Sequence, residues 1–419
     1  MRIVIIAPGS RGDVQPYVAL GKGLSKAGHH VRMVTHQNFA ALVDEHDLEF
    51  WPLEISTQEI VQHDKMRQVL EQGGLLTSMA QMAKALKANV RHLAERGLTA
   101  SGDRELVLAG IGGLFVAAAI SEAQGIPFLP ALNVPFTPTS AFPGTLLPAF
   151  PAGIQGATNR LSHHLSRQIV WQAYRPADKL VCQFLGLSAS SFWGPFRELD
   201  RRPMLYGISP AVLARPTDWG ASIRVTGYWF LDQEADWSPP PALEAFLQAG
   251  PPPVYIGFGS MGARKPEKTA NLVVQALRRA GQRAIILSGW SGLRERDLPD
   301  ALVMTESVPH AWLFRRVAAV VHHGGAGTTA AGLRAGVPTI VIPFHGDQPF
   351  WGRRVAELGV GPTPIPRHKL TAENLGQAIA QAVGDQAMRE RAARLGATIR
   401  AEDGIAVAVA AVEEIVLNR

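Results

Sequence analysis

Short apolar runs alternate with amphipathic segments along most of the chain. In the first half, apolar runs at 2–8 and 30–35 enclose residues 14–27, whose apolar positions recur at the spacing of a helix. Two further runs, 106–111 and 127–131, are apolar almost throughout and predict strands buried on both faces. The pattern therefore predicts strands and helices in alternation.

The same alternation restarts in the second half. Apolar runs at 254–258, 284–287, 318–322 and 339–343 predict strands, and the segments between them have helical patterns. Strands that alternate with helices form parallel sheets with right-handed crossovers, and such sheets bind ligands beyond the carboxyl ends of their strands. We therefore predict an α/β protein of two doubly wound, Rossmann-like parallel-sheet domains that face each other across a cleft.

Two proline triplets mark a boundary between the halves. Residues 239–241 and 251–253 are both Pro-Pro-Pro, which continues neither a helix nor a strand ladder, and they flank a short helical pattern. The predicted parts are an N-terminal domain at 1–232, a linker at 233–253, a C-terminal domain at 254–397, and a C-terminal helix within 398–419 that packs back on the N-terminal domain.

Composition indicates a folded protein with a mild basic excess. Of the 419 residues, 47% are hydrophobic and 18% charged, and the 41 Lys and Arg against 35 Asp and Glu give a formal charge of +6. This excess suits anionic ligands or surfaces, but it forms no basic arm of the kind that binds nucleic acid. The single cysteine, Cys182, excludes an intrachain disulfide. The first apolar run is too short for a signal peptide, so we expect a cytoplasmic protein.

A glycine-rich segment follows the predicted strand at 318–322. Glycines let the backbone approach an anion, and the N-terminus of the next helix offers free N–H groups and a partial positive charge. The alternative is a tight strand–helix turn whose threonines cap the helix. The candidate anion-binding residues are His322, Gly324, Gly325, Ala326, Gly327 and Thr328.

Asp347 and Gln348 follow the predicted strand at 339–343. A neighbouring carboxylate and carboxamide can accept and donate hydrogen bonds to several sugar hydroxyls at the ligand-binding edge of a sheet. The alternative is a turn that begins a helix, with Pro349 in its first turn.

Asp13 lies in the loop that follows the first strand. A carboxylate held there is a candidate general base for a hydroxyl group. The alternative is a structural role, because Asp is a favoured N-cap residue and Asp13 precedes the predicted helix.

Three segments resemble one enzyme family. They are GSRGDVQP at 9–16, VPFTPTSAFPGTLLPAF at 134–150, and the 48-residue region at 308–355 that contains HHGGAGTT and GDQP. In this order and spacing they resemble the GT-B-fold glycosyltransferases that include sterol 3β-glucosyltransferases and bacterial natural-product enzymes of the UDP-glycosyltransferase superfamily. The resemblance implies a UDP-dependent hexosyltransferase that inverts the anomeric carbon and needs neither a metal ion nor another cofactor.

The resemblance also implies individual roles. Asp13 would be the catalytic base, and Asp347 and Gln348 would form hydrogen bonds with the sugar hydroxyls. Val308 would hold the nucleotide base through its main chain. The remaining donor contacts would be Ser10 and Gly12 in the first loop, Ser260 beside the phosphates, His322 on the diphosphate, and Gly324, Gly325, Ala326, Gly327 and Thr328 around it.

Two departures leave the donor open. Ala330 stands where plant relatives carry a ribose-binding Glu, and Ser307 replaces a Trp at the start of the box. UDP-glucose with a sterol-like acceptor, giving a β-glucoside, fits the motifs best. The alternative is a macrolide, polyketide or carotenoid acceptor with a UDP- or dTDP-sugar. A nucleotide-sugar epimerase or a non-catalytic binding protein would leave the Asp13 loop unexplained.

The acceptor is expected in the N-terminal domain. Aromatic residues on its loops favour an apolar pocket, whereas the neighbouring pair His163-His164 is typical of a solvated helix face. The expected partners are a nucleotide sugar and a hydrophobic small molecule, with at most peripheral membrane contact, no nucleic acid, and a monomeric or homodimeric state. The candidate acceptor-binding residues are Met79, Phe136, Phe142, Phe150 and Trp193.

Overall fold

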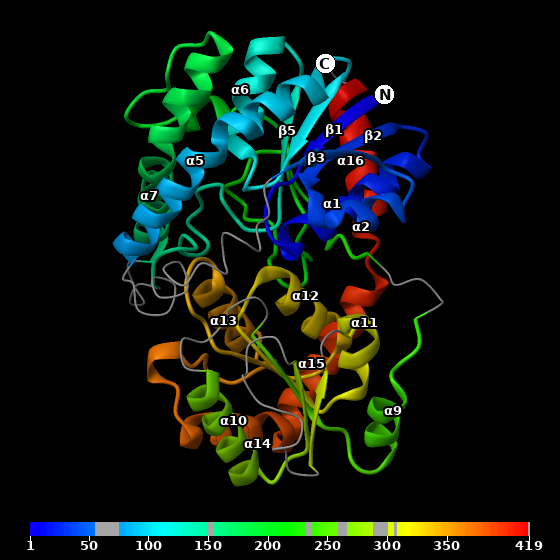
Figure 1. The fold of residues 1–419 in the computed structure, drawn as a ribbon. Helices are drawn as coiled ribbons and strands as arrows, with labels where there is room; N and C mark the ends of the chain where they lie inside the picture. The colour runs from blue at the N-terminus through cyan, green and yellow to red at the C-terminus, as the bar shows by residue number, and fades with distance from the viewer. Residues whose placement is uncertain are drawn as a thin grey trace. The chain divides into compact units, whose positions relative to one another are not determined.

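A computed structural model of the chain describes residues 1–54, 75–148, 155–231, 237–258, 266–287, 301–305 and 308–417. The chain divides into two compact units: the first ends at Leu231 and also takes in the segment from Glu402 onward, and the second ends at Ala401. Each unit is built on its own sheet with helices packed around it (Figure 1). Within the described ranges, no helix combines the length and apolar character needed to cross a membrane.

The first unit contains a parallel sheet of seven strands in the order β3-β2-β1-β4-β5-β6-β7. Strand β1 pairs with β2 on one side and β4 on the other, so the strand order reverses beside β1. The strands are β1 (Arg2–Ile6), β2 (His30–His36), β3 (Glu49–Leu53), β4 (Leu106–Ala109), β5 (Phe128–Leu132), β6 (Met204–Tyr206) and β7 (Ile223–Val225).

Helices cover both faces of this sheet. Ile3 and Ile5 of β1 pack with helices α1 and α16 on one face, whereas Ile6 lies close to α5 and α6. The helices of the unit are α1 (Arg11–Lys26), α2 (Ala40–Asp44), α5 (Leu75–Ser101), α6 (Leu114–Gln124), α7 (Gln155–Leu185), α8 (Phe196–Leu199) and α16 (Gly404–Leu417).

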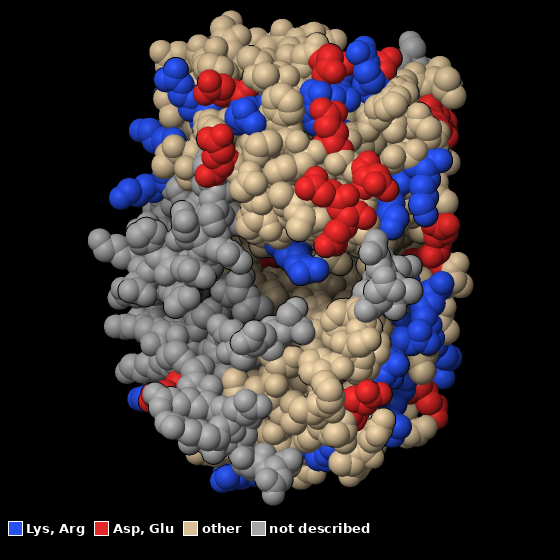
Figure 2. Space-filling model, turned by 45° about the vertical axis from the view of Figure 1, so that its right-hand side comes forward, with Lys and Arg blue, Asp and Glu red and all other residues tan. Residues whose placement is uncertain are grey.

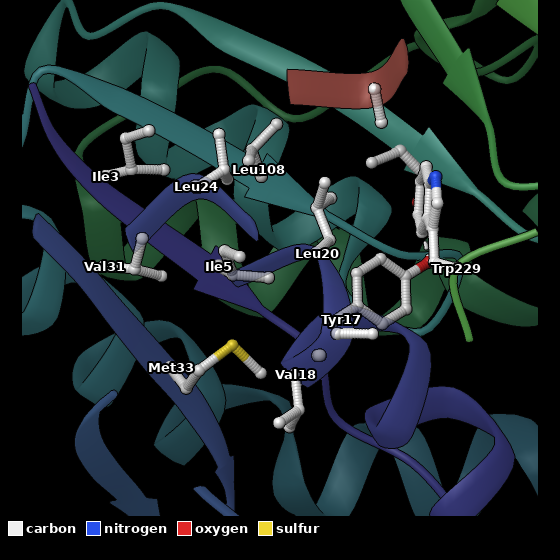
Figure 3. Packing of buried hydrophobic residues seen from close by; sticks show 14 of the residues in the cluster. Ile3, Ile5, Tyr17, Val18, Leu20, Leu24, Val31, Met33, Leu108 and Trp229 are labelled. Atoms are coloured by element: carbon white, nitrogen blue, oxygen red, sulfur yellow. Dashed lines mark hydrogen bonds between the residues drawn. The ribbon is translucent and has the colours of Figure 1, made fainter. Parts of the chain in front are cut away.

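Figure 3 shows the core between β1, β2 and α1. Tyr17 of α1 makes an edge-to-face contact with Trp229 at a centroid distance of 5.8 Å, and its hydroxyl donates to the carbonyl of Ala131 at 2.6 Å. Both rings are buried. This arrangement fixes the N-terminal half of α1 against the carboxyl ends of the strands.

The C-terminal helix α16 belongs to this unit. It packs on α1, where Gly23 lies against the side chains of Ile405 and Val409. Arg224 donates to Glu414 at 2.6 Å, and Ser209 donates to Glu402 at 2.7 Å where the chain enters the helix. The last residues of the described chain therefore complete the core of the first unit.

The second unit contains a parallel sheet of five strands in the order β10-β9-β8-β11-β12. Tyr255 and Ile256, adjacent in β8, point to opposite faces: Ile256 packs against α10 and α14, and Tyr255 packs against α9 and α11. The strands are β8 (Val254–Gly257), β9 (Ala284–Leu287), β10 (Leu302–Thr305), β11 (Ala319–His322) and β12 (Thr339–Val341). The helices are α9 (Pro241–Gln248), α10 (Pro266–Ala280), α11 (His310–Leu313), α12 (Ala326–Ala335), α13 (Gln348–Glu357), α14 (Ala372–Gly384) and α15 (Gln386–Ala401).

The prediction of two doubly wound parallel-sheet domains is confirmed. The limits of α1 are different: this helix begins at Arg11 with Ser10 as its N-cap, so Asp13 is its third residue and not an N-cap. The surface that Figure 2 shows has Lys and Arg interspersed with Asp and Glu. That mixture is typical of an ordinary solvated surface.

Candidate functional site

The Asp13 carboxylate lies at the start of α1, directly after β1. Its oxygen Oδ2 accepts hydrogen bonds from the backbone N–H of Ser10 at 2.9 Å and from the Ser10 hydroxyl at 2.8 Å. The strand order reverses beside β1, and doubly wound sheets bind ligands at such a reversal. The candidate base therefore lies where this fold offers a ligand site.

Gly9 makes room for this carboxylate. Its φ of +148° is a conformation that residues with a side chain rarely adopt, and a Cβ there would lie 2.6 Å from both Cβ and Oδ2 of Asp13. The Gly-Ser pair thus shapes the loop around Asp13: Gly9 by having no side chain, and Ser10 by its two donors.

Burial raises the pKa of the half-buried Asp13 carboxyl above its ordinary value of 3.8. The two bonds from Ser10 and the nearby His36 act in the opposite direction and favour the ionised form. Asp13 in turn contributes, with burial, to the raised pKa of Tyr17. An Asp with a raised pKa is a stronger base than an ordinary one, as proton abstraction from a hydroxyl requires.

In the second unit, β11 leads through a glycine turn into α12. Gly324 has a φ of +91°, and a Cβ there would lie 2.6 Å from a methyl carbon of Val341. Gly325 is the N-cap of α12, so Ala326, Gly327 and Thr328 form its first turn. Backbone N–H groups in a first turn have no partner within the helix and are aimed at whatever lies beyond its end.

Three histidines surround this turn with unsatisfied ring nitrogens. His322 is fully buried and accepts a bond from the Gly324 N–H at its Nδ1, so its proton lies on Nε2. Among the described residues, no partner lies within hydrogen-bond distance of Nε2 of His322, Nδ1 of His323 or Nε2 of His345. Buried polar atoms of this kind indicate a place for a polar ligand.

These histidines are neutral at physiological pH. Burial lowers the pKa of His322 far below 6.5 and that of His323 to about 4, and it also lowers the pKa of His345. Repulsion from neighbouring histidines adds to the effect at His322 and His323. They would therefore contact an anion as neutral hydrogen-bonding groups, with the charge of the helix N-terminus behind them.

Asp347 and Gln348 begin α13, after β12. Oε1 of Gln348 accepts from the N–H groups of Phe344 at 2.8 Å and His345 at 3.2 Å, which occupies both lone pairs and leaves the NH₂ group for a ligand. Oδ2 of Asp347 accepts from the indole N–H of Trp351 at 2.8 Å. The backbone of Gln348 also lies within 3.1 Å of a Cβ placed on Gly324, so this pair adjoins the glycine turn.

Three other predicted donor contacts lie apart from these groups or outside the described residues. Val308 is buried with Leu313 and Phe314, so only its main chain is suited to a ligand. Ser260 lies outside the described residues. Gly12 is exposed in the first turn of α1, two residues from Ser10.

Two of the predicted acceptor residues share one well-anchored loop. The N–H groups of Phe136 and Thr137 both donate to the hydroxyl of Tyr206, at 3.1 and 2.8 Å. The Phe136 ring is buried beneath the guanidinium of Arg167, 4.9 Å away. Phe142 is partly exposed and makes an edge-to-face contact with His163 at 5.6 Å. Phe142 is thus the more accessible of the two.

The other predicted acceptor residues are not placed with them. Trp193 stands 71% exposed on a loop before α8, where its ring contacts Phe192 at 5.2 Å. Phe150 and the side chain of Met79 lie outside the described part of the chain.

Three groups that shape the site were not among the predicted site residues. Trp351 orients Asp347 from the next turn of α13, a spacing of four residues that the sequence shows. His323 and His345 bring unsatisfied nitrogens to the glycine turn, and only the fold places them together. Among the described residues, no group of three His, Cys, Asp or Glu side chains is arranged to hold a metal ion.

Comparison with protein families gives two matches. Residues 3–143 match the family model described as "Glycosyltransferase family 28 N-terminal domain". Residues 282–415 match the model described as "Erythromycin biosynthesis protein CIII-like, C-terminal domain". The first contains Asp13, and the second contains the glycine turn and the Asp347–Gln348 pair.

Curated relatives match almost the whole chain. The sterol 3-beta-glucosyltransferase UGT80B1 of Arabidopsis thaliana is 35% identical over 98% of this chain and 67% of its own length. A sterol 3-beta-glucosyltransferase of Emericella nidulans is 36% identical over 98% of this chain but only 30% of its own length, so the chain spans less than a third of that relative.

Solved structures share the fold at lower identity. The glycosyltransferase of kitacinnamycin has a TM-score of 0.69 at 20% identity and covers 99% of this chain, with 98% of its own chain matched. The Streptomyces glycosyltransferase SsfS6, solved with thymidine diphosphate, has a TM-score of 0.63 at 18% identity over 99% of both chains.

Proposed function

The chain belongs to the family of GT-B-fold glycosyltransferases that includes the sterol 3-beta-glucosyltransferases, and from this premise we propose that it transfers a sugar from a nucleoside diphosphate sugar to a hydroxyl of a hydrophobic acceptor. The observation that carries the proposal is the Asp13 carboxylate, held by Ser10 at the carboxyl end of β1. The motifs and relatives favour glucose from UDP-glucose and a sterol-like acceptor.

In the proposed step, the Asp13 carboxylate takes the proton of the acceptor hydroxyl. The hydroxyl oxygen forms a bond to the anomeric carbon of the sugar, while the bond from that carbon to the phosphate oxygen breaks. The electron pair leaves on the nucleoside diphosphate. Attack from the face opposite the leaving group inverts the anomeric carbon, so an α-linked donor gives a β-glycoside.

The leaving diphosphate gains negative charge as the bond breaks. We assign its binding to the first turn of α12, where the free N–H groups and the helix dipole stabilise an anion. The Nε2–H of His322 and the ring nitrogens of His323 and His345 would add hydrogen bonds. Because these groups together compensate the developing charge, we propose that the reaction proceeds without a metal ion.

Asp347 and Gln348 would bind the sugar. The Trp351 indole fixes the Asp347 carboxylate, which accepts from sugar hydroxyls, and the Gln348 NH₂ group donates to them. Asp13 is in the first unit and these residues are in the second, so transfer uses both units of the chain.

A second candidate differs only in its substrates. The solved structures with this fold include enzymes named for natural products, and one was solved with thymidine diphosphate. The alternative is therefore a natural-product glycosyltransferase that uses a dTDP-sugar and a macrolide, polyketide or carotenoid acceptor.

The test measures nucleotide release and glycosylated product with no added metal. The protein is incubated with UDP-glucose or a dTDP-sugar and a panel of sterols, macrolides and carotenoids, with the Asp13→Asn variant alongside. Sterol glucoside from the wild type alone supports the first candidate, and product only with dTDP-sugar and a natural product supports the second. No turnover with any pair, despite a folded protein, would overturn the proposal.

A further inference from the structure

Four large apolar side chains stand in solvent around helix α7. Leu161 and Leu165 are 56% and 47% exposed, and Phe192 and Trp193 are 49% and 71% exposed. We call these four residues the Trp193 patch. Single exposed apolar residues are normal on a protein surface, but a contiguous group indicates a binding surface.

Leu161 and Leu165 lie on one face of α7, and the loop after the helix brings Phe192 and Trp193 to that face. Residues 161, 165, 168 and 172 are spaced by four, three and four positions, which places them in one line along a helix. Gln168 and Gln172 each donate through Nε2 to the carbonyl of Phe192, at 3.0 and 2.8 Å. These bonds bring Phe192 and Trp193 to the same line as the two leucines, whereas His163 and Arg167 lie on the opposite, buried face.

The loop that carries the two aromatic rings is firmly held. Its backbone accepts a bond from the indole of Trp171 at Ser191 and donates one from Ser190 to Asp178, at 3.2 and 3.0 Å. Gly194 has a φ of +80°, and a Cβ there would lie 3.0 Å from the Trp171 ring. The exposure of Trp193 is therefore a property of an anchored loop.

Basic side chains accompany the patch. The Arg175 guanidinium lies 5.3 Å above the Phe192 ring, and Lys179 is exposed one turn further along α7. Residues 155–203 contain seven Lys or Arg against three Asp or Glu, a net charge of +4. Among these basic residues, Arg175 and Lys179 fall on the same line of α7 as Leu161 and Leu165, so the patch carries positive charge.

We propose that the Trp193 patch binds the surface of an anionic lipid bilayer. Trp193 and Phe192 would enter the boundary between headgroups and acyl chains, where aromatic rings partition well, and Arg175 and Lys179 would face the lipid phosphates. A second copy of this chain fits less well: a stable dimer buries about 800 Å² per partner, from about 20 residues a side, and would oppose two basic surfaces.

The experiment measures sedimentation of the full chain with lipid vesicles. One set is pure phosphatidylcholine and the other contains equal parts of phosphatidylcholine and phosphatidylglycerol. The wild type is expected to bind the anionic vesicles and to be released by high salt, which screens the attraction. Phe192→Ala/Trp193→Ala should weaken that binding about tenfold or more, since it removes both rings. Leu417→Ala, which truncates an 84%-exposed residue on α16, is the matched control and should bind as the wild type does.

A charge variant separates the two contributions. Arg175→Gln/Lys179→Gln should weaken binding to the anionic vesicles and reduce its salt dependence, with the aromatic rings intact. Circular dichroism and the thermal transition show that each variant is folded.

Three results would overturn the proposal. They are no binding of the wild type to anionic vesicles, unchanged binding of the folded aromatic variant, and a concentration-dependent dimer that the aromatic variant abolishes. The last result would assign the patch to self-association. The readout needs no sugar transfer, so its failure is independent of the proposed function.

Discussion

Both hydrogen bonds from Ser10 to Asp13 end on the same carboxylate oxygen, Oδ2, at 2.9 Å from the backbone nitrogen and 2.8 Å from the hydroxyl. This geometry fixes the plane of the carboxylate. We infer that Oδ1 is the oxygen that receives the acceptor proton, because two donors already engage Oδ2.

Asp13→Asn is expected to lower kcat by about 10² to 10⁴, the usual contribution of a general base. The asparagine side chain keeps an oxygen that can accept from Ser10 but cannot take a proton. Turnover is measured by nucleotide release, and donor binding by calorimetry should be largely unchanged, since the residues proposed to bind the diphosphate and the sugar lie in the second unit and asparagine can still accept from Ser10. Wild-type turnover in the variant would contradict the assignment.

Asp13→Asn should be at least as stable as the wild type at pH 7. Because burial raises the pKa of Asp13 above 3.8, the folded state binds its proton more tightly than the unfolded state. Its contribution to stability is therefore fully present below pH 3.8 and is lost as the pH rises through the folded-state pKa. Asparagine is neutral at every pH and avoids this loss. Urea denaturation of both proteins at pH 7 checks the point.

Ser10→Ala should shift the pH dependence of kcat/KM. Activity falls as the pH decreases through the pKa of Asp13, because the base must be ionised. The Ser10 hydroxyl lowers that pKa, so its removal moves the acidic limb to higher pH. A hydrogen bond to a charged group is worth about 1.5–3 kcal/mol, which corresponds to roughly one to two pH units.

The comparison for Ser10 is Ser10→Thr. Threonine retains a hydroxyl at the same position, so its acidic limb should stay close to that of the wild type. An acidic limb that does not move in Ser10→Ala would show that another group is the titrating base.

Gly9→Ala should impair both activity and stability. The new Cβ would lie 2.6 Å from Cβ and Oδ2 of Asp13, so the carboxylate or the loop must move. A displacement near 1 Å at a reacting group can cost about 10² in rate. Gly28→Ala is the control: Gly28 also has a positive φ, of +87°, but its Cβ would meet no atom within 4 Å. It should lose about 1–2 kcal/mol of stability and no activity.

The fold was largely predictable because its central strands are apolar runs buried on both faces. Apolar residues fill β1, β4 and β8, and no polar position interrupts the pattern within their buried parts. Strands β3, β6, β7 and β10 were missed. β6 and β7 are only three residues long, and in β3 the charged Glu49 and the proline Pro52 interrupt the apolar run that predicts a buried strand. Such strands form because neighbouring strands offer them a partner.

The candidate site was predicted less completely. The residue types and their order indicated Asp13 and the glycine turn, but the spacing did not show that Ser10 would be the N-cap and would hold Asp13. The prediction that His163 lies on a solvated helix face is wrong. Its ring is buried, because the loop that contains Phe142 folds over it from 21 residues away. Tertiary packing decides which face of a helix another segment covers, and the sequence of the helix alone does not show it.

The burial of His163 predicts a loss of stability in mild acid. Burial lowers its pKa from 6.5 to about 4, while its Nε2 lies 3.0 Å from the carbonyl of Phe142. As the pH decreases, His163 is therefore protonated near pH 6.5 in the unfolded state but only near pH 4 in the folded state. The stability from this group is present above pH 6.5, falls as the pH decreases from 6.5 to 4, and then levels off.

Because of His163 alone, the free energy of unfolding at pH 5 should be lower than at neutral pH by roughly 2 kcal/mol. His163→Gln keeps a side-chain N–H for the Phe142 carbonyl but does not titrate, so its stability should fall less between pH 7 and pH 5. Partial burial also lowers the pKa of the neighbouring His164, but its side chain is exposed and far less covered than that of His163, so His164→Gln should preserve most of the wild-type slope. Urea unfolding followed by circular dichroism at both pH values gives the two slopes. Equal slopes for His163→Gln and the wild type would mean that another buried group, such as His323, carries the acid sensitivity.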